Sequence, residues 1–243
     1  MNNKDKETVS LDDVIKYSKE YSDFAFELAV ASNVRQCDIE VFDQSGIYKD
    51  PNTNIPREFD IRARRVLKQD NVLAMQGHAL FPIECKNIRD HSPLVVHCIR
   101  RDLSKSYQNA IYNPSDHSDA FLSNQQIILW ERDGLYSNSC KPWEWVGLSI
   151  DQIRKDISGH IKSSDANVYN KIAQATQSGY DLITDACLST KTEEVVYVVH
   201  PVLVIPDDRL FIIKYENEVP LESEHAQYIS YYSGYETIVQ YNT

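Results

Sequence analysis

The chain of 243 residues lacks an apolar run of the roughly 18–20 residues that a membrane-spanning helix needs. It also lacks a C-x-x-C pair, and its five cysteines form an odd, irregularly spaced set that argues against a disulfide framework. Its seven glycines include neither the G-x-x-x-x-G-K-[ST] phosphate loop nor the G-x-S-x-G elbow of acyl transfer. Together with the polar segment 1–13, these absences predict a cytoplasmic, reducing setting and no membrane partner.

Excess basic charge is missing as well, since the formal net charge is −11. A protein that binds nucleic acid mainly through non-specific phosphate contacts is usually basic, so this balance argues against an architectural nucleic-acid binder. One basic segment exists within the acidic whole. Residues 57–68 carry four arginines and a lysine against two carboxylates. This segment is either a patch for phosphates or a solvated charged strand, and the composition alone favours the second.

The first third of the chain predicts a helix followed by strands. Ser10 and Asp13 have the S-x-x-D spacing of a helix start, and apolar residues then recur at three- and four-residue steps over 11–32. Alternating apolar and charged residues follow, which is typical of strands with one buried face. The predicted strands, which we expect to form a meander, lie at 36–43, 57–67 and within 72–86.

The remainder predicts a mixed α/β (α+β) layout within a single domain, 1–243, in which 87–160 is a large insertion after the third strand. Apolar periodicity indicates a helix over 165–188, and the apolar run at 195–216 indicates a hairpin of buried strands. Pro201 interrupts the first arm of that hairpin, which suggests an edge, a bend or a bulge. Less regular segments predict a helix, a strand and a helix at 100–112, 124–134 and 227–241, respectively.

The charged residues within the predicted strands suggest chemistry. Asp60 lies in the second strand, and Glu84 lies two residues before Lys86 in the third. Side chains on one face of adjacent strands lie about 5 Å apart at Cβ, where two carboxylates repel unless a cation lies between them. Two carboxylates, the backbone carbonyl of Cys85 and waters would suit Mg²⁺, with Mn²⁺ able to substitute. Lys86 would orient an attacking water or stabilise the transition state.

A plainer interpretation competes with this one. The acid-x-Lys pattern is common, and the same residues would form ordinary cross-strand ion pairs if the hairpin faced solvent. Exposed pairs of that kind contribute only about 0–1 kcal/mol each. On the chemistry alone, the catalytic and the structural interpretations are about equally supported.

The arrangement of these residues along the chain resembles the PD-(D/E)xK nuclease superfamily. The likeness rests on Phe-Glu27 in the first helix, Phe-Asp60 in the second strand and Ile-Glu84-Cys85-Lys86 in the third. It implies a restriction-endonuclease-like central mixed sheet flanked by helices, with Mg²⁺-dependent cleavage of nucleic acid. By this resemblance Asp60 and Glu84 are metal ligands, Lys86 is the catalytic lysine and Glu27 is an accessory acid. The Gln-x-x-x-Tyr signature of some exonuclease-like branches has no match on the later helix.

The expected function is therefore a metal-dependent nuclease acting on DNA, although the residues leave RNA and either endo- or exonuclease action open. Arg62 and Arg64 share the face of Asp60 by strand alternation and are candidate phosphate contacts. The alternative is a catalytically silent module with the same fold that binds nucleic acid or a protein. The acidic charge and fifteen tyrosines would suit a protein interface or a homo-oligomer.

Overall fold

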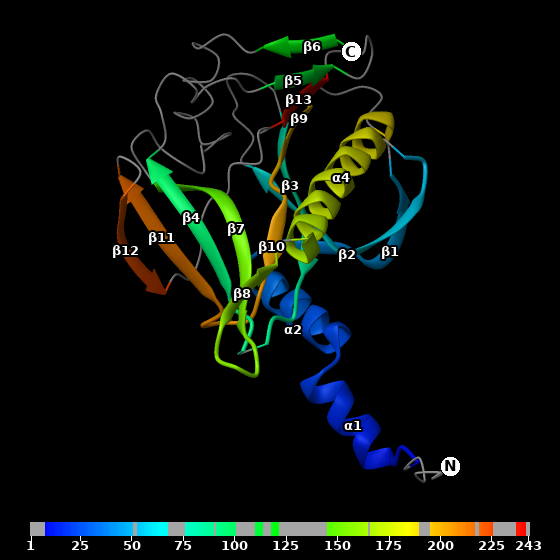
Figure 1. Cartoon of the computed structure of the whole chain (residues 1–243). Coiled ribbons are helices and arrows are strands. Elements are labelled where there is room, and N and C mark those ends of the chain that lie inside the picture. The colour runs from blue at the N-terminus through cyan, green and yellow to red at the C-terminus, as the bar shows by residue number, and fades with distance from the viewer. Residues whose placement is uncertain are drawn as a thin grey trace.

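The structure is a computed structural model of the chain (Figure 1). It describes residues 8–50, 53–67, 76–89, 91–100, 110–113, 118–121, 145–164, 166–189, 195–216, 219–225 and 237–241. Within these ranges the helices are α1 (Leu11–Glu20), α2 (Asp23–Gln36) and α4 (Ala166–Ser189). No helix in the described residues is both long enough and apolar enough to cross a membrane.

The described strands form two mixed sheets. The first sheet follows the order β1 (Glu40–Lys49), β2 (Pro56–Leu67), β3 (Gln76–Cys85), β9 (Val195–Val199), β13 (Thr237–Tyr241), β5 (Ala110–Asn113) and β6 (Ser118–Phe121), and β10 (Val202–Val204) also pairs with β3. The second follows the order β12 (Val219–His225), β11 (Leu210–Glu216), β4 (Leu94–Arg100), β7 (Trp145–Lys155) and β8 (Ile161–Ser164). The predicted mixed α+β class is thus confirmed, but the single central sheet is replaced by two.

Strand alternation in the first sheet directs two faces toward two helices. On one face, Ile61 and Ala63 of β2 and Ile83 of β3 pack with Val30 and Ala31 of α2. On the other face, residues of β3 and β9 pack with α4 through the cluster Leu80, Leu182, Ile183, Tyr197 and Val199. The part of the sheet built from β2 and β3 therefore lies between α2 and α4, and even-numbered residues of these strands point toward α4.

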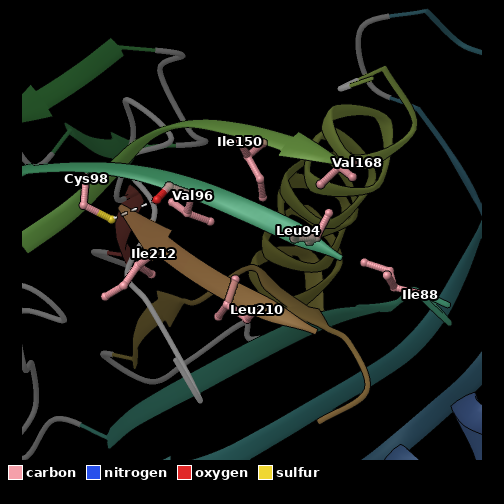
Figure 2. Packing of buried hydrophobic residues seen from close by; sticks show 8 residues of the cluster. All are labelled: Ile88, Leu94, Val96, Cys98, Ile150, Val168, Leu210 and Ile212. Atoms are coloured by element: carbon pink, nitrogen blue, oxygen red, sulfur yellow. Dashed lines mark hydrogen bonds between the residues drawn. The ribbon is translucent and has the colours of Figure 1, made fainter. Parts of the chain in front are cut away.

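Helix α4 also covers the second sheet. Val168, which is fully buried near the start of α4, packs against apolar side chains of β4, β7 and β11 (Figure 2). Close contact on the other side of the helix depends on Gly179, because a Cβ there would lie 2.9 Å from Cγ1 of Val199. The glycine that weakens the helical pattern in the sequence thus allows the helix to approach the first sheet.

Several predicted elements are confirmed with shifted boundaries. The helix expected over 11–32 is two helices, α1 and α2, separated at residues 21–22. The capping box at Ser10 forms as predicted, with Ser10 Oγ accepting from the backbone N–H of Asp13 at 3.2 Å. The antiparallel meander β1–β2–β3 is present, and the helix expected over 165–188 is α4.

Other predictions were wrong. The segment 195–216 is not a hairpin: β9 and β10 both run parallel to β3, and β11 runs parallel to β4 in the second sheet. Pro201 lies between β9 and β10, where it separates two short strands. The ends of two segments predicted as helices are strands, since β5 begins at Ala110 and β13 spans the last part of 227–241. The predicted strand 124–134 lies outside the described residues, as do 101–109 and 226–236.

The segment 87–160 contributes to both sheets. Its β4 and β7 pair with each other in the second sheet, and its β5 and β6 extend the first sheet beyond β13. The parallel pairing of β4 with β11 ties this segment to the last third of the chain.

Candidate functional site

The register of β2 and β3 brings the two predicted carboxylates together. Ile61 pairs with Ile83 in the antiparallel ladder, so that Asp60 and Glu84, one step along, lie directly across from each other. Both point to the face covered by α4. Their exposed fractions are 7% for Asp60 and 1% for Glu84. A solvent-facing hairpin with cross-strand surface pairs is therefore ruled out for these residues.

The cation between the carboxylates is Lys171 of α4. Its Nζ lies 2.7 Å from Oε2 of Glu84, and 3.0 Å and 3.3 Å from Oδ2 and Oδ1 of Asp60. Lys171 is one helical turn from the buried residues Val168 and Ala175, which fixes the side of α4 that meets the sheet. The ammonium group thus bridges two strands from a helix more than eighty residues further along the chain.

The two carboxylates differ in how they are satisfied. Asp60 Oδ2 accepts a hydrogen bond from the backbone N–H of Cys85 at 2.7 Å in addition to its bond from Lys171. Glu84 Oε1, by contrast, is buried and has no hydrogen-bond partner in the described part of the chain. A buried carboxylate oxygen without a donor or cation is costly, so this atom marks an acceptor that a ligand would satisfy.

Burial and charge shift the proton equilibria of this cluster. Burial and the neighbouring charge of Asp60 raise the pKa of Glu84 to about 7, although the bond from Lys171 opposes the rise. For Lys171, burial by itself would lower the pKa. Its hydrogen bonds to Glu84 and Asp60 outweigh burial and raise the pKa above the ordinary lysine value. Lys171 is therefore charged at neutral pH, and Glu84 changes its protonation state near neutrality.

The residues fit a hard divalent cation in their chemistry. Two carboxylates share one face, one oxygen lacks a partner, and an ammonium group already occupies a cation-binding position between them. Cys85, whose carbonyl was the third predicted ligand, directly follows Glu84 and is bonded to Asp60 through its N–H. Among the described residues, no group of three or more His, Cys, Asp or Glu side chains converges on a metal position. The protein ligands on offer are thus the carboxylate pair and a backbone oxygen.

Lys86 is not the lysine that contacts the carboxylates. Its backbone N–H donates to the carbonyl of Val204 at 2.9 Å, which joins the end of β3 to β10. Within the described residues, the half-buried Lys86 side chain forms no ion pair or hydrogen bond. The prediction that Lys86 would supply the cation next to Asp60 and Glu84 is therefore corrected: the ammonium in contact with both comes from Lys171.

Glu27 approaches the cluster from the other face of the sheet. It lies on α2, and its pKa is raised by burial and then by the charge of Asp60. No hydrogen bond or ion pair joins it to Asp60, Glu84 or Lys171 among the described contacts. Glu27 is electrostatically coupled to the site but is not a member of the contacting group.

The arginines predicted to contact phosphate are engaged elsewhere. Arg62 is buried, and its guanidinium donates to Asp181 Oδ2 at 2.6 Å and to Ser178 Oγ at 3.2 Å, both on α4. A buried, paired guanidinium holds α4 on the sheet and is not presented to a substrate. Arg64 is exposed but pairs with Glu40 of β1 at 2.6 Å. Much of the basic character of β2 is therefore neutralised within the fold.

Comparison with known proteins adds no family to this description: no protein-family model, no curated protein and no solved structure matches the chain.

Proposed function

We propose that the chain is a metal-dependent phosphodiester hydrolase whose active site is the carboxylate pair Asp60 and Glu84, with DNA as the expected substrate. The observation that carries this proposal is the pair itself, two almost fully buried carboxylates directly opposed on neighbouring strands. Removing two charges from water costs several kcal/mol per ion, and apolar residues of similar volume often give equal or better stability. Strongly shifted pKa values at buried groups of this kind are typical of functional sites.

Each residue has a distinct role in the proposal. A bound Mg²⁺ would lower the pKa of its water and neutralise charge on a phosphate oxygen. Asp60 and Glu84 would hold that ion, and the unpartnered Oε1 of Glu84 gives it an open acceptor. Lys171 balances the paired negative charges and keeps them in place on the sheet. Lys86, which follows Glu84 and has no ion pair in the described contacts, is the lysine available to a phosphate.

A cleavage assay tests the proposal and the role of Lys86. The full chain is incubated with linear, circular and single-stranded DNA, either with Mg²⁺ or with a chelator, next to the variants Lys86→Gln and Lys49→Gln. We expect cleavage only with the divalent ion. Loss of one positioned charge at a developing negative centre typically lowers the rate about 100-fold, and we expect this of Lys86→Gln. Lys49→Gln, an exposed change on β1 of the same sheet, should cleave at the wild-type rate. Equal rates for both variants would remove Lys86 from the mechanism.

A second candidate is a catalytically silent module that binds nucleic acid or a protein. One observation favours it: Lys171 already neutralises both carboxylates, so the cluster is a closed structural ion-pair network without any metal. Under this alternative the chain binds DNA or a protein with full affinity but cleaves nothing in Mg²⁺ or Mn²⁺. Measured binding without turnover in either ion would favour the module over the enzyme.

A further inference from the structure

Helix α1 presents an apolar stripe to solvent. The stripe consists of Leu11, Val14, Ile15, Tyr17 and Tyr21, which recur at three- and four-residue steps along one side of the helix. Every member is exposed, with fractions as large as 74% for Leu11 and 61% for Tyr17. Figure 1 shows α1 at the N-terminal end, standing away from the body of the protein and continuing into α2. The side of an amphipathic helix that normally packs on a core therefore faces water.

This helix needs a partner for its stability. Helices shorter than about 12–15 residues are marginal in water even when their composition is favourable, and α1 has 10 residues. Its capping box stabilises only the first turn. The junction with α2 is held in place, because Arg89 donates to the carbonyl of Tyr21 at 3.3 Å and lies over its ring. The arm is thus anchored at its base and unsupported along its apolar side.

The charges beside the stripe indicate which partner fits. Asp12 and Lys19 are seven residues apart, so they lie on the same flank of the stripe, one near each end of the helix. When two identical helices pack antiparallel, this flank of one copy faces the same flank of the other. Asp12 of each copy then meets Lys19 of its partner, and the pairing occurs twice. A parallel arrangement instead turns this flank toward the opposite flank, where Asp13 would repel Asp12.

We propose that α1 is a self-association arm, which packs antiparallel against α1 of a second copy of this chain through the apolar stripe. Phe24 and Leu28 of α2, which are also about half exposed, continue the apolar surface past the junction and enlarge the contact. Stable interfaces bury about 1,200–2,000 Å² in total, more than a single short helix pair provides. The dimer is therefore concentration-dependent and weak. The proposal does not depend on the catalytic role of Asp60 and Glu84.

A lipid surface suits α1 less well. Amphipathic helices that lie on membranes carry an excess of lysine and arginine on the polar side, which attracts anionic lipids. The polar side of α1 instead balances Lys16 and Lys19 with Asp12 and Asp13. The charge pattern is that of a self-complementary protein interface.

Analytical ultracentrifugation of the full chain over a wide concentration range tests the arm. We expect a monomer–dimer equilibrium for the wild type, and a dimer dissociation constant at least about tenfold higher for Val14→Glu, which places a charge in the stripe. The matched control is Lys16→Glu, which introduces the same glutamate in the middle of the polar side and should leave the equilibrium unchanged. Circular dichroism of each variant confirms that the fold is retained.

A charge exchange tests the antiparallel orientation. Asp12→Lys and Lys19→Asp alone should each weaken the dimer, because each places like charges together at both ends. The double variant restores both pairs in reversed sense and should associate like the wild type. A wild-type chain that stays monomeric at every concentration overturns the proposal, as does a Val14→Glu variant that dimerises normally. Binding of the monomer to phosphatidylserine vesicles without self-association would overturn it by assigning the stripe to lipid.

Discussion

Replacing Lys171 by methionine is expected to lower the free energy of unfolding by about 3 kcal/mol at about pH 8, because it leaves two buried carboxylates without their shared cation. Methionine keeps nearly the length and volume of the lysine side chain, so the change tests the charge and not the packing. The Lys171 side chain is 23% exposed, which places the effect toward the lower end of the range for breaking a buried ion pair. Urea unfolding of both proteins measures it.

The same substitution should be milder in acid. Burial and Asp60 raise the pKa of Glu84 to about 7 in the folded protein, above its ordinary value of 4.5. A group whose folded pKa is raised stabilises the fold fully below its unfolded pKa, and this contribution is lost as the pH rises through the folded value. At about pH 5 Glu84 is therefore protonated, one negative charge is absent, and Lys171→Met removes less stability than at about pH 8.

Lys162→Met is the matched control. Lys162 pairs with Asp156 at 3.3 Å, but its side chain is 61% exposed, so the pair contributes less than about 1 kcal/mol. If Lys171→Met were as mild as Lys162→Met at every pH, the ammonium would not be neutralising the buried carboxylates. The electrostatic account of the cluster would then be wrong.

Asp60→Asn and Glu84→Gln are each expected to lower the cleavage rate by at least about a thousandfold, since a divalent ion contributes several kcal/mol to the transition state and each factor of ten corresponds to about 1.4 kcal/mol. Both changes keep the shape of the side chain and remove only its charge. The structural cost should be small because an amide still accepts a hydrogen bond from Lys171. Initial rates at saturating Mg²⁺, next to thermal unfolding of each variant, separate lost chemistry from lost fold.

The control for this pair is Glu40→Gln. It makes the same chemical change on β1 of the same sheet, where the carboxylate is exposed and paired with Arg64. We expect wild-type cleavage from this variant. Cleavage at wild-type rates by Asp60→Asn and Glu84→Gln would instead show that any activity arises elsewhere.

The carboxylate pair could be predicted from the sequence because its geometry is local. Alternation assigns Asp60 and Glu84 to one face of their strands, and a short antiparallel meander makes those strands neighbours. The second sheet could not be found in this way. Its core pairing joins Leu94 to Leu210, and nothing in the apolar pattern of either strand identifies a partner more than a hundred residues away.

Lys171 was missed for a related reason, although the sequence carried a signal. In the helical pattern of α4, Lys171 lies between Val168 and Ala175 on the buried side, and a lysine within an apolar stripe usually has a partner. The acid-x-Lys spacing directed attention to Lys86 instead. Only the docking of α4 on the first sheet decides which ammonium reaches the carboxylates, and the same docking buries Arg62 against Asp181.

Titration of the full chain with Mn²⁺, followed by calorimetry, tests most directly whether Asp60 and Glu84 together hold a divalent ion. The account predicts binding by the wild type and by Glu40→Gln, tighter as the pH rises past 7, because Glu84 has to ionise before it can bind a cation. It also predicts that Asp60→Asn and Glu84→Gln each abolish this binding. Wild-type affinity in both variants, or no binding by the wild type, would contradict the account.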